Sequence, residues 1–316
     1  MKFKMSRLSP IFIVFILGAL LGVILENNYN FIDIFRGDFK TKSESEITQI
    51  TKNSIPQKYQ VKLQLFILAG QSNMSGLGEL PTKTKTHPKI YVFGNDYRWK
   101  LAKEPMDDPI NQVDKVSIDI SAGYSPAMDF AIALLQERPG MVIGLIPCAK
   151  SGSSIYDWQR NGNLDENTLY GSCLKRVRAA SLMGNVAGIL FFQGEIDTVD
   201  PNDKTNRILS ANKWTHKSPN EWANKFTLLI NNLRGDLKSP NLPVVFAQIG
   251  SNTEPERFIN WAVVQEQQRS VKLPNSAMIT TDDLALKDYV HFTTKSYQTI
   301  GQRFAKAYLS LQKLQP

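Results

Sequence analysis

The chain has 316 residues, of which 42% are hydrophobic and 21% are charged. These proportions are those of a globular protein, and they exclude a disordered or fibrous chain. The formal net charge is +8, but the Lys and Arg residues form no dense block and no ladder with aromatic residues, so we expect no nucleic-acid partner.

The first 25 residues have the pattern of a membrane signal. Three basic residues precede an apolar run, IFIVFILGALLGVIL, over residues 11–25. As a helix, residues 8–25 would span about 27 Å, close to the hydrocarbon thickness of a bilayer. The run is followed by Glu26 and shows no small-x-small cleavage site, so we expect an uncleaved anchor. The basic flank would stay in the cytoplasm and place the rest of the chain on the extracytoplasmic side. The alternative is secretion after signal cleavage.

Residues 26–60 are polar and lack periodicity, so we interpret them as a tether to a folded domain over residues 61–316. Within that domain, short apolar runs alternate with amphipathic segments. This alternation is typical of a parallel sheet covered on both faces, and it predicts a single α/β domain. The predicted strands are 63–70, 141–147, 186–193, 243–250 and 276–281, and the predicted helices are 126–137, 169–183, 221–233, 261–271 and 295–312.

A serine follows the first predicted strand. The strand runs into Gly70-Gln71-Ser72, and in an open parallel sheet the chemistry gathers at the carboxyl ends of the strands. Gly70 would allow a sharp turn that presents Ser72 at the sheet edge. Its hydroxyl becomes a nucleophile only if a base lies nearby. Otherwise Ser72 simply caps the next helix.

The chain has only three histidines from which to choose that base. His87 and His216 lie in polar stretches without a carboxylate at a useful spacing. His291 follows Asp288 by three residues, just before the last predicted helix. An aspartate in such a turn can accept a hydrogen bond from one ring nitrogen while the other nitrogen faces a serine. The alternative is an ordinary surface turn.

Two further segments can supply donors to a developing oxyanion. Gln193 ends a predicted strand, and its amide can donate to such an oxygen, although it can equally tie down a loop. Ser125 precedes a predicted helix, where backbone N–H groups are available or where it serves only as a cap. Glu195, two residues after Gln193, is a second candidate for the acid that orients the histidine.

Five blocks of the sequence, taken in order, resemble the sialate O-acetylesterase and acetylxylan esterase family, which is carbohydrate esterase family six of the SGNH (GDSL-type) hydrolases. The blocks are AGQSNMSG, GYSPAMDFA, IPCAKSGSSIYDW, GILFFQGEIDTVD and DYVHFTTKSYQTIGQRFA. The resemblance covers residues 63–307. It implies a three-layer α/β/α sandwich with a mostly parallel sheet, no metal or other cofactor, and hydrolysis of acetyl esters on carbohydrates through an acyl-enzyme.

The resemblance also implies a role for each site residue. Ser72 would be the nucleophile, His291 the base and Asp288 the orienting acid. The oxyanion would receive hydrogen bonds from the Ser72 N–H, from a backbone N–H at Ser125 and from the Gln193 side chain.

The sequence departs from the family pattern at two places. Ser125 stands where the family has glycine, and Ser151-Gly152 stands where it has two glycines. We expect these changes to affect specificity more than activity. Two alternative functions stay open: transfer of acetyl groups onto a cell-surface glycan, and glycan binding without catalysis. Cys148 and Cys173 are either a disulfide or a pair of buried thiols, and the oligomeric state is not indicated.

Overall fold

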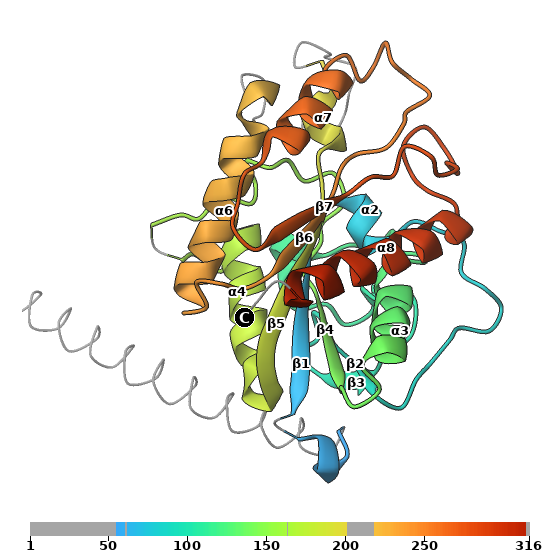
Figure 1. Cartoon of the computed structure of the whole chain (residues 1–316), viewed down its shortest axis with the longest axis vertical. Helices are drawn as coiled ribbons and strands as arrows, with labels where there is room; N and C mark the ends of the chain where they lie inside the picture. Colours follow the sequence, from blue (N-terminus) through green and yellow to red (C-terminus); the bar gives the residue numbers. More distant parts are fainter. Residues whose placement is uncertain (1–54, 61, 163, 201–217, 314–316) are drawn as a thin grey trace, which may run out of the picture. The chain divides into compact units, whose positions relative to one another are not determined.

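The structure is a computed structural model, and it describes residues 55–60, 62–162, 164–200 and 218–313 (Figure 1). The predicted anchor over residues 1–25 and nearly all of the predicted tether lie outside these ranges. None of the helices within them is long and apolar enough to cross a bilayer. The predicted boundaries at residues 25 and 60 therefore stay predictions.

Within the described residues, seven strands form one sheet in the order β3-β2-β4-β1-β5-β6-β7. All neighbouring strands are parallel except β3, which runs antiparallel to β2 at the edge. The prediction of a mostly parallel sheet is confirmed. The strands are β1 (Leu63–Gly70), β2 (Ile90–Phe93), β3 (Trp99–Leu101), β4 (Ile143–Pro147), β5 (Gly184–Phe192), β6 (Val244–Ala247) and β7 (Ser276–Ile279).

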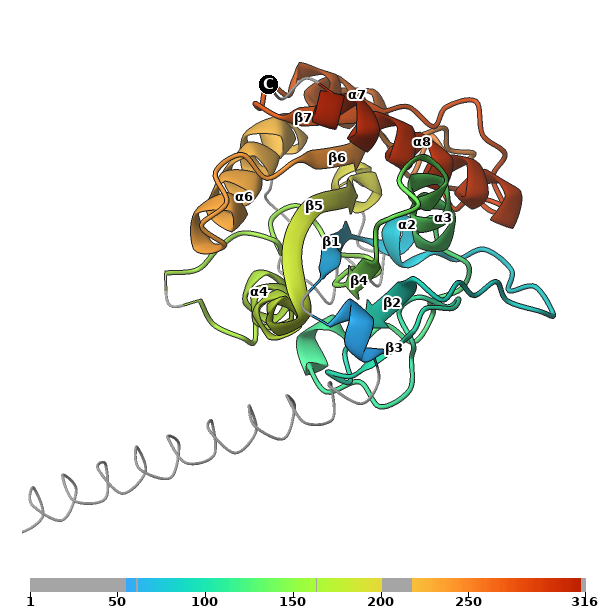
Figure 2. The ribbon, with the colours of Figure 1, turned by 60° about the horizontal axis from the view of Figure 1, so that its bottom comes forward.

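Helices cover both faces of this sheet (Figure 2). On one face, α3 (Ala127–Glu137) packs against α8 (Thr294–Lys313). On the other lie α4 (Leu169–Ala180) and α6 (Trp222–Asp236), and α7 (Trp261–Ser270) contacts α6. The three-layer architecture follows from apolar strands whose two faces both need covering.

Aromatic side chains form the core on each side of the sheet. Phe66 of β1 meets Phe130 of α3 and Tyr308 of α8 edge-on, with ring centroids 4.9 and 5.1 Å apart. Phe191 of β5 contacts Trp222 and Phe226 of α6. These edge-to-face and tilted contacts are the arrangements that aromatic rings prefer.

The strand order brings three loops together at one edge of the sheet. β1 lies between β4 and β5, although both come much later in the chain. The segments that follow these three strands therefore start side by side, at the carboxyl edge. A disulfide between Cys148, directly after β4, and Cys173 of α4 ties the β4 end to the helix layer, with their Cα atoms 5.3 Å apart.

Candidate active site

The turn after β1 explains why a glycine precedes the serine. Gly70 has φ 133°, and a Cβ on it would lie 2.0 Å from the carbonyl oxygen of Phe192 on the neighbouring strand β5. Any other residue would force the two strands apart. The chain then turns into the short helix α2 (Ser72–Ser75), which places Ser72 at the carboxyl edge of the sheet.

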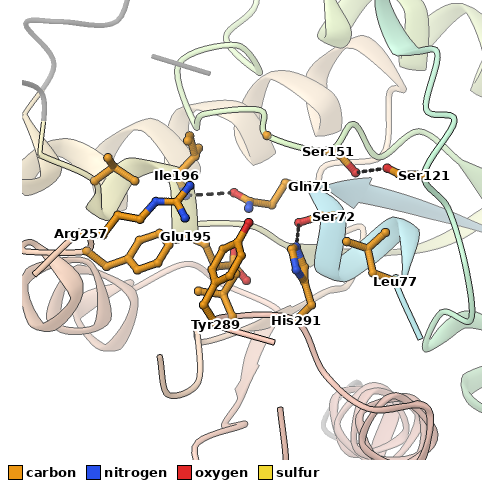
Figure 3. Close-up of a pocket in the computed structure, with 14 residues that line it drawn as sticks. Gln71, Ser72, Leu77, Ser121, Ser151, Glu195, Ile196, Arg257, Tyr289 and His291 are labelled. Atoms are coloured by element: carbon orange, nitrogen blue, oxygen red, sulfur yellow. Dashed lines mark hydrogen bonds between the residues drawn. The ribbon is translucent and has the colours of Figure 1, made fainter. Parts of the chain in front are cut away.

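Ser72, His291 and Asp288 form a hydrogen-bonded chain, the first part of which is drawn in Figure 3. The Nε2 atom of His291 lies 2.9 Å from Ser72 Oγ. On the other side of the ring, Nδ1 lies 2.8 Å from Asp288 Oδ2 and 3.0 Å from Oδ1. The structure thus brings together the three residues that the sequence analysis predicts as nucleophile, base and acid.

The turn that carries Asp288 also keeps its carboxylate charged. Asp288 Oδ1 accepts the backbone N–H groups of His291 at 2.8 Å and of Val290 at 3.0 Å. Burial alone would raise the pKa of Asp288, but these two bonds and the imidazole outweigh burial and lower it. An ionised carboxylate is what the Nδ1 side of the histidine requires, because it fixes the tautomer that leaves Nε2 free to accept a proton.

Glu195, the alternative acid, lies in a different environment. Its side chain is buried, and its Oε1 accepts a hydrogen bond from Asn73 Nδ2, while Oε2 has no partner among the described residues. Asn73 also donates to the backbone oxygen of Val290 at 3.1 Å and accepts from the Tyr297 hydroxyl at 2.6 Å. Burial raises the pKa of Glu195 to about 7. The carboxylate that contacts the histidine is therefore Asp288, and Glu195 is hydrogen-bonded to Asn73 instead.

The serine and histidine open into a pocket of about 230 Å³. In Figure 3, Ser121 and Ser151 lie on one side of Ser72 and His291, with Arg257 on the other. Arg257 forms an ion pair with Glu254 at 3.1 Å. Among the described residues, no three His, Cys, Asp or Glu side chains are grouped as metal ligands.

Aromatic rings form part of the pocket wall. The rings of Tyr289 and Phe258 are stacked with their centroids 5.9 Å apart. The Arg257 guanidinium lies over Tyr289, 4.8 Å from the ring centroid. The wall therefore combines flat apolar faces with a cation.

Comparison with known proteins places this geometry in a family. The sequence model of a family described as carbohydrate esterase, sialic acid-specific acetylesterase, matches residues 62–310. The chain is also 32% identical, over 268 residues, to the probable carbohydrate esterase At4g34215 of Arabidopsis thaliana; the match covers 78% of this chain and 90% of that protein. The chain belongs to this carbohydrate esterase family. The predicted enzyme class, a carbohydrate O-acetylesterase, is thereby confirmed.

Solved structures show the same fold. The X-ray structure of the Arabidopsis protein aligns with a TM-score of 0.62 at 30% identity, over 79% of this chain and 98% of that one. NanS aligns with a TM-score of 0.57 at 17% identity, over 81% and 99% of the two chains. A carbohydrate acetylesterase from Xanthomonas citri also aligns with a TM-score of 0.57 at 17% identity. That alignment covers 80% of this chain and 57% of the other chain. The SGNH-type fold inferred from the five blocks is confirmed.

Two of the donors that the family resemblance implied are placed elsewhere in this carbohydrate esterase. Ser125 is fully buried, and its hydroxyl donates to Glu104 Oε1 at 2.8 Å. Ser125 does not line the pocket beside Ser72. The structure therefore does not bring Ser125 to the pocket, and its service to the oxyanion stays a prediction.

Gln193 is likewise buried behind the pocket wall. Its Oε1 accepts from Trp222 Nε1 at 2.9 Å, and its Nε2 donates to Asp197, to Ser153 O at 3.0 Å and to Gln71 Oε1 at 3.2 Å. Two N–H groups thus already face three acceptors, and Gln193 is absent from the pocket lining. In this structure the Gln193 amide is engaged by its neighbours and does not reach the pocket, so its direct service to the oxyanion stays a prediction.

The loop after β4 brings Gly152 to the pocket. The sequence analysis had considered this residue only as part of a departure from the family pattern. Gly152 lines the pocket close to Ser72, with φ 71°. Neither the Gly152 N–H nor the Ser72 N–H is hydrogen-bonded to any other residue that the structure describes. The family pattern of a glycine pair at Ser151-Gly152 was the signal available, and only the strand order shows that this loop adjoins the serine.

Proposed function

We propose that this esterase removes O-acetyl groups from carbohydrates by a serine mechanism, with Ser72 as nucleophile, His291 as general base and Asp288 as the acid that orients the base. The observation that carries the proposal is the unbroken path from Ser72 Oγ through the imidazole to Asp288, with contacts of 2.9 and 2.8 Å. These are distances at which a proton transfers between positioned groups.

In the first half of the reaction, Ser72 Oγ attacks the acetyl carbonyl carbon while its proton passes to His291 Nε2. The carbonyl electron pair moves onto oxygen, and the N–H groups of Ser72 and Gly152 are available to it as donors. Collapse of this intermediate breaks the bond to the sugar oxygen, which takes the proton from His291. Water then attacks the acetyl-Ser72 ester by the same route, releasing acetate and restoring the serine.

The pocket wall supports a sugar as the alcohol part of the ester. The ring of Tyr289 is partly exposed in the pocket wall and packs on the buried ring of Phe258, and such an aromatic surface suits contact with the apolar face of a sugar ring. The guanidinium of Arg257 matches the planar, bidentate geometry of a carboxylate, and the family description names sialic acid. We therefore propose O-acetylated sugars as substrates, with acidic sugars among them.

The proposal is tested by Ser72→Ala in the full chain. Loss of a nucleophile should lower kcat by on the order of 10⁴-fold or more, measured as acetate release from acetylated xylan, O-acetyl sialosides and bacterial polysaccharides. Ser270→Ala, at an exposed serine of α7, is the matched control. A Ser72→Ala enzyme with a tenth of the activity would show that another residue attacks.

The same assay addresses the alternative functions. Adding an acceptor glycan distinguishes hydrolysis from acetyl transfer, because transfer would yield acetylated acceptor in place of acetate. A wild-type chain that binds acetylated glycans and releases no acetate from any of them would point to binding alone.

We also propose that residues 1–25 anchor the enzyme with its catalytic domain outside the cytoplasm. The support is the basic and apolar pattern of these residues, together with the Cys148–Cys173 disulfide, because disulfides persist mainly in oxidising compartments. Membrane fractionation followed by sequencing of the mature amino terminus tests this, and a soluble product lacking residues 1–25 would indicate secretion.

A further inference from the structure

The side-chain amide of Gln71, the residue directly before Ser72, is held in one orientation. Its Oε1 accepts hydrogen bonds from Gln193 Nε2 at 3.2 Å, from the Gly194 N–H at 3.3 Å and from the Ile196 N–H at 3.5 Å. All three donors come from the segment after β5. A flipped amide would place its own N–H groups against these donors, so the oxygen stays on that side.

The opposite end of the same amide faces the pocket. Gln71 is 97% buried and yet lines the pocket together with Ser72 (Figure 3). Its Nε2 has no acceptor within the part of the chain that the structure describes, and it is not sealed from solvent. A donor that is open to the pocket and that no described residue uses is available to an acceptor atom on whatever enters the pocket.

Gln193 fixes this arrangement from behind. Trp222 Nε1 donates to Gln193 Oε1 at 2.9 Å, which determines which end of the Gln193 amide is nitrogen. That nitrogen can then donate to Gln71. The two amides form a relay that runs from the helix layer at α6 to the pocket surface.

We propose that Gln71 Nε2 donates a hydrogen bond to the carbonyl oxygen of the bound acetyl ester and stabilises the negative charge that develops there when Ser72 attacks. Gln193 is a positioning residue that acts through Gln71. The assignment rests on the proposed serine mechanism and adds to it the side-chain donor that Gln193 does not supply directly.

The test is Gln71→Glu in the full chain. A glutamate keeps an oxygen for the Gly194 and Ile196 N–H groups but presents a second oxygen, in place of N–H, to the pocket. Loss of one such donor should lower kcat by about 10²–10³-fold with KM changed little. Gln302→Glu, exposed on α8, adds the same charge away from the pocket and should leave kcat unchanged. Should Gln71→Glu fail to fold, Gln71→Asn, which withdraws the amide by one methylene, should lose kcat similarly.

A second readout separates this inference from the mechanism beneath it. A fluorophosphonate phosphonylates a serine nucleophile: the serine oxygen bonds to phosphorus, fluoride leaves, and the phosphoryl oxygen occupies the oxyanion position. Mass spectrometry should find the label on Ser72 of the wild type, with labelling slowed about 10²-fold or more in Gln71→Glu.

The outcomes fall into two groups. An unlabelled Ser72 in the wild type would overturn the proposed serine mechanism itself. A labelled Ser72 with unchanged kcat and labelling rate in Gln71→Glu would overturn the role of Gln71 alone. A rise in KM with kcat retained would do the same, because it would assign Gln71 to holding the sugar.

Discussion

Two carboxylates near the serine lie in environments that shift their pKa values in opposite directions. Asp288 is partly exposed and accepts backbone N–H groups, so its pKa is lowered. Glu195 is buried against Asn73, and burial raises its pKa to about 7. The first is suited to stabilising an imidazolium, and the second to a structural hydrogen bond.

This contrast predicts a difference between two conservative variants. Asp288→Asn should lower kcat by up to about 10⁴-fold, because an amide holds the imidazole in the wrong tautomer. Glu195→Gln should cost about tenfold at most, since a glutamine oxygen still accepts from Asn73. Both variants are assayed on one acetyl ester after a check of folding. As controls, His291→Ala should lose nearly all activity and His87→Ala should retain it. If Glu195→Gln lost more activity than Asp288→Asn, Glu195 and not Asp288 would be the acid that orients His291.

Sequence reasoning located Ser72 by its place at the end of a strand, and it located Asp288 and His291 by their short spacing. Asp288 and His291 share one turn, so their spacing alone predicts the contact. The environments of Ser125 and Gln193 are set by distant residues. The Ser125 hydroxyl donates to Glu104, and the Gln193 amide accepts from Trp222 and donates to Gln71. No spacing along the chain encodes these contacts, because they depend on how the strands are ordered.

At the scale of elements, the disulfide joins the end of β4 to α4. The residues just after Cys148 include Ser151 and Gly152 of the pocket, and Ser154, which donates to Asp197. The loop that carries the proposed Gly152 donor is therefore tied at its start by a covalent bond.

Replacing Cys148 and Cys173 together by alanine should lower both stability and activity. Closing a loop of 25 residues contributes about 3 kcal/mol, so Tm should fall by on the order of 10 °C, with a several-fold loss in kcat/KM as the loop loosens. Thermal denaturation with and without reductant measures the effect, and the double variant should be insensitive to reductant. A wild type whose Tm is indifferent to reductant would contradict this role.

The elements that could be predicted from the sequence are mainly the buried ones. The predicted central strands are confirmed because β1, β4, β5 and β6 carry continuous apolar runs. Strands β2 and β3, which lie next to each other at one end of the sheet, were not predicted. They have four and three residues and stand outside the long apolar runs, and β3 forms only by antiparallel pairing with β2.

At the scale of the whole molecule, buried carboxyl groups set the dependence of stability on pH. Burial raises the pKa of Glu104 to about 8 and those of Asp107 and Glu195 to about 7. An acid whose pKa is higher in the folded state binds more protons there than in the unfolded chain. The free energy of unfolding therefore falls as pH rises from about 4.5 through 7 to 8.

Glu195→Gln should flatten part of this decline. The variant removes one titrating group, so its loss of Tm between pH 5 and pH 8 should be smaller than that of the wild type by on the order of 5 °C. Its unpartnered amide N–H groups cost stability equally at every pH, which shifts the curve without changing its slope. Parallel curves for the two proteins would show that Glu195 does not titrate in this range.

The separation of 219 residues between Ser72 and His291 has a consequence for biosynthesis. The strand that presents the serine, β1, is made before the other strands of the described sheet, whereas the turn that presents the histidine is made after β7. A nascent chain, or one clipped by a protease before residue 288, would contain the proposed nucleophile without its proposed base. On the proposed mechanism such fragments should not deacetylate any substrate, so activity should appear only in chains that include the turn of Asp288 and His291.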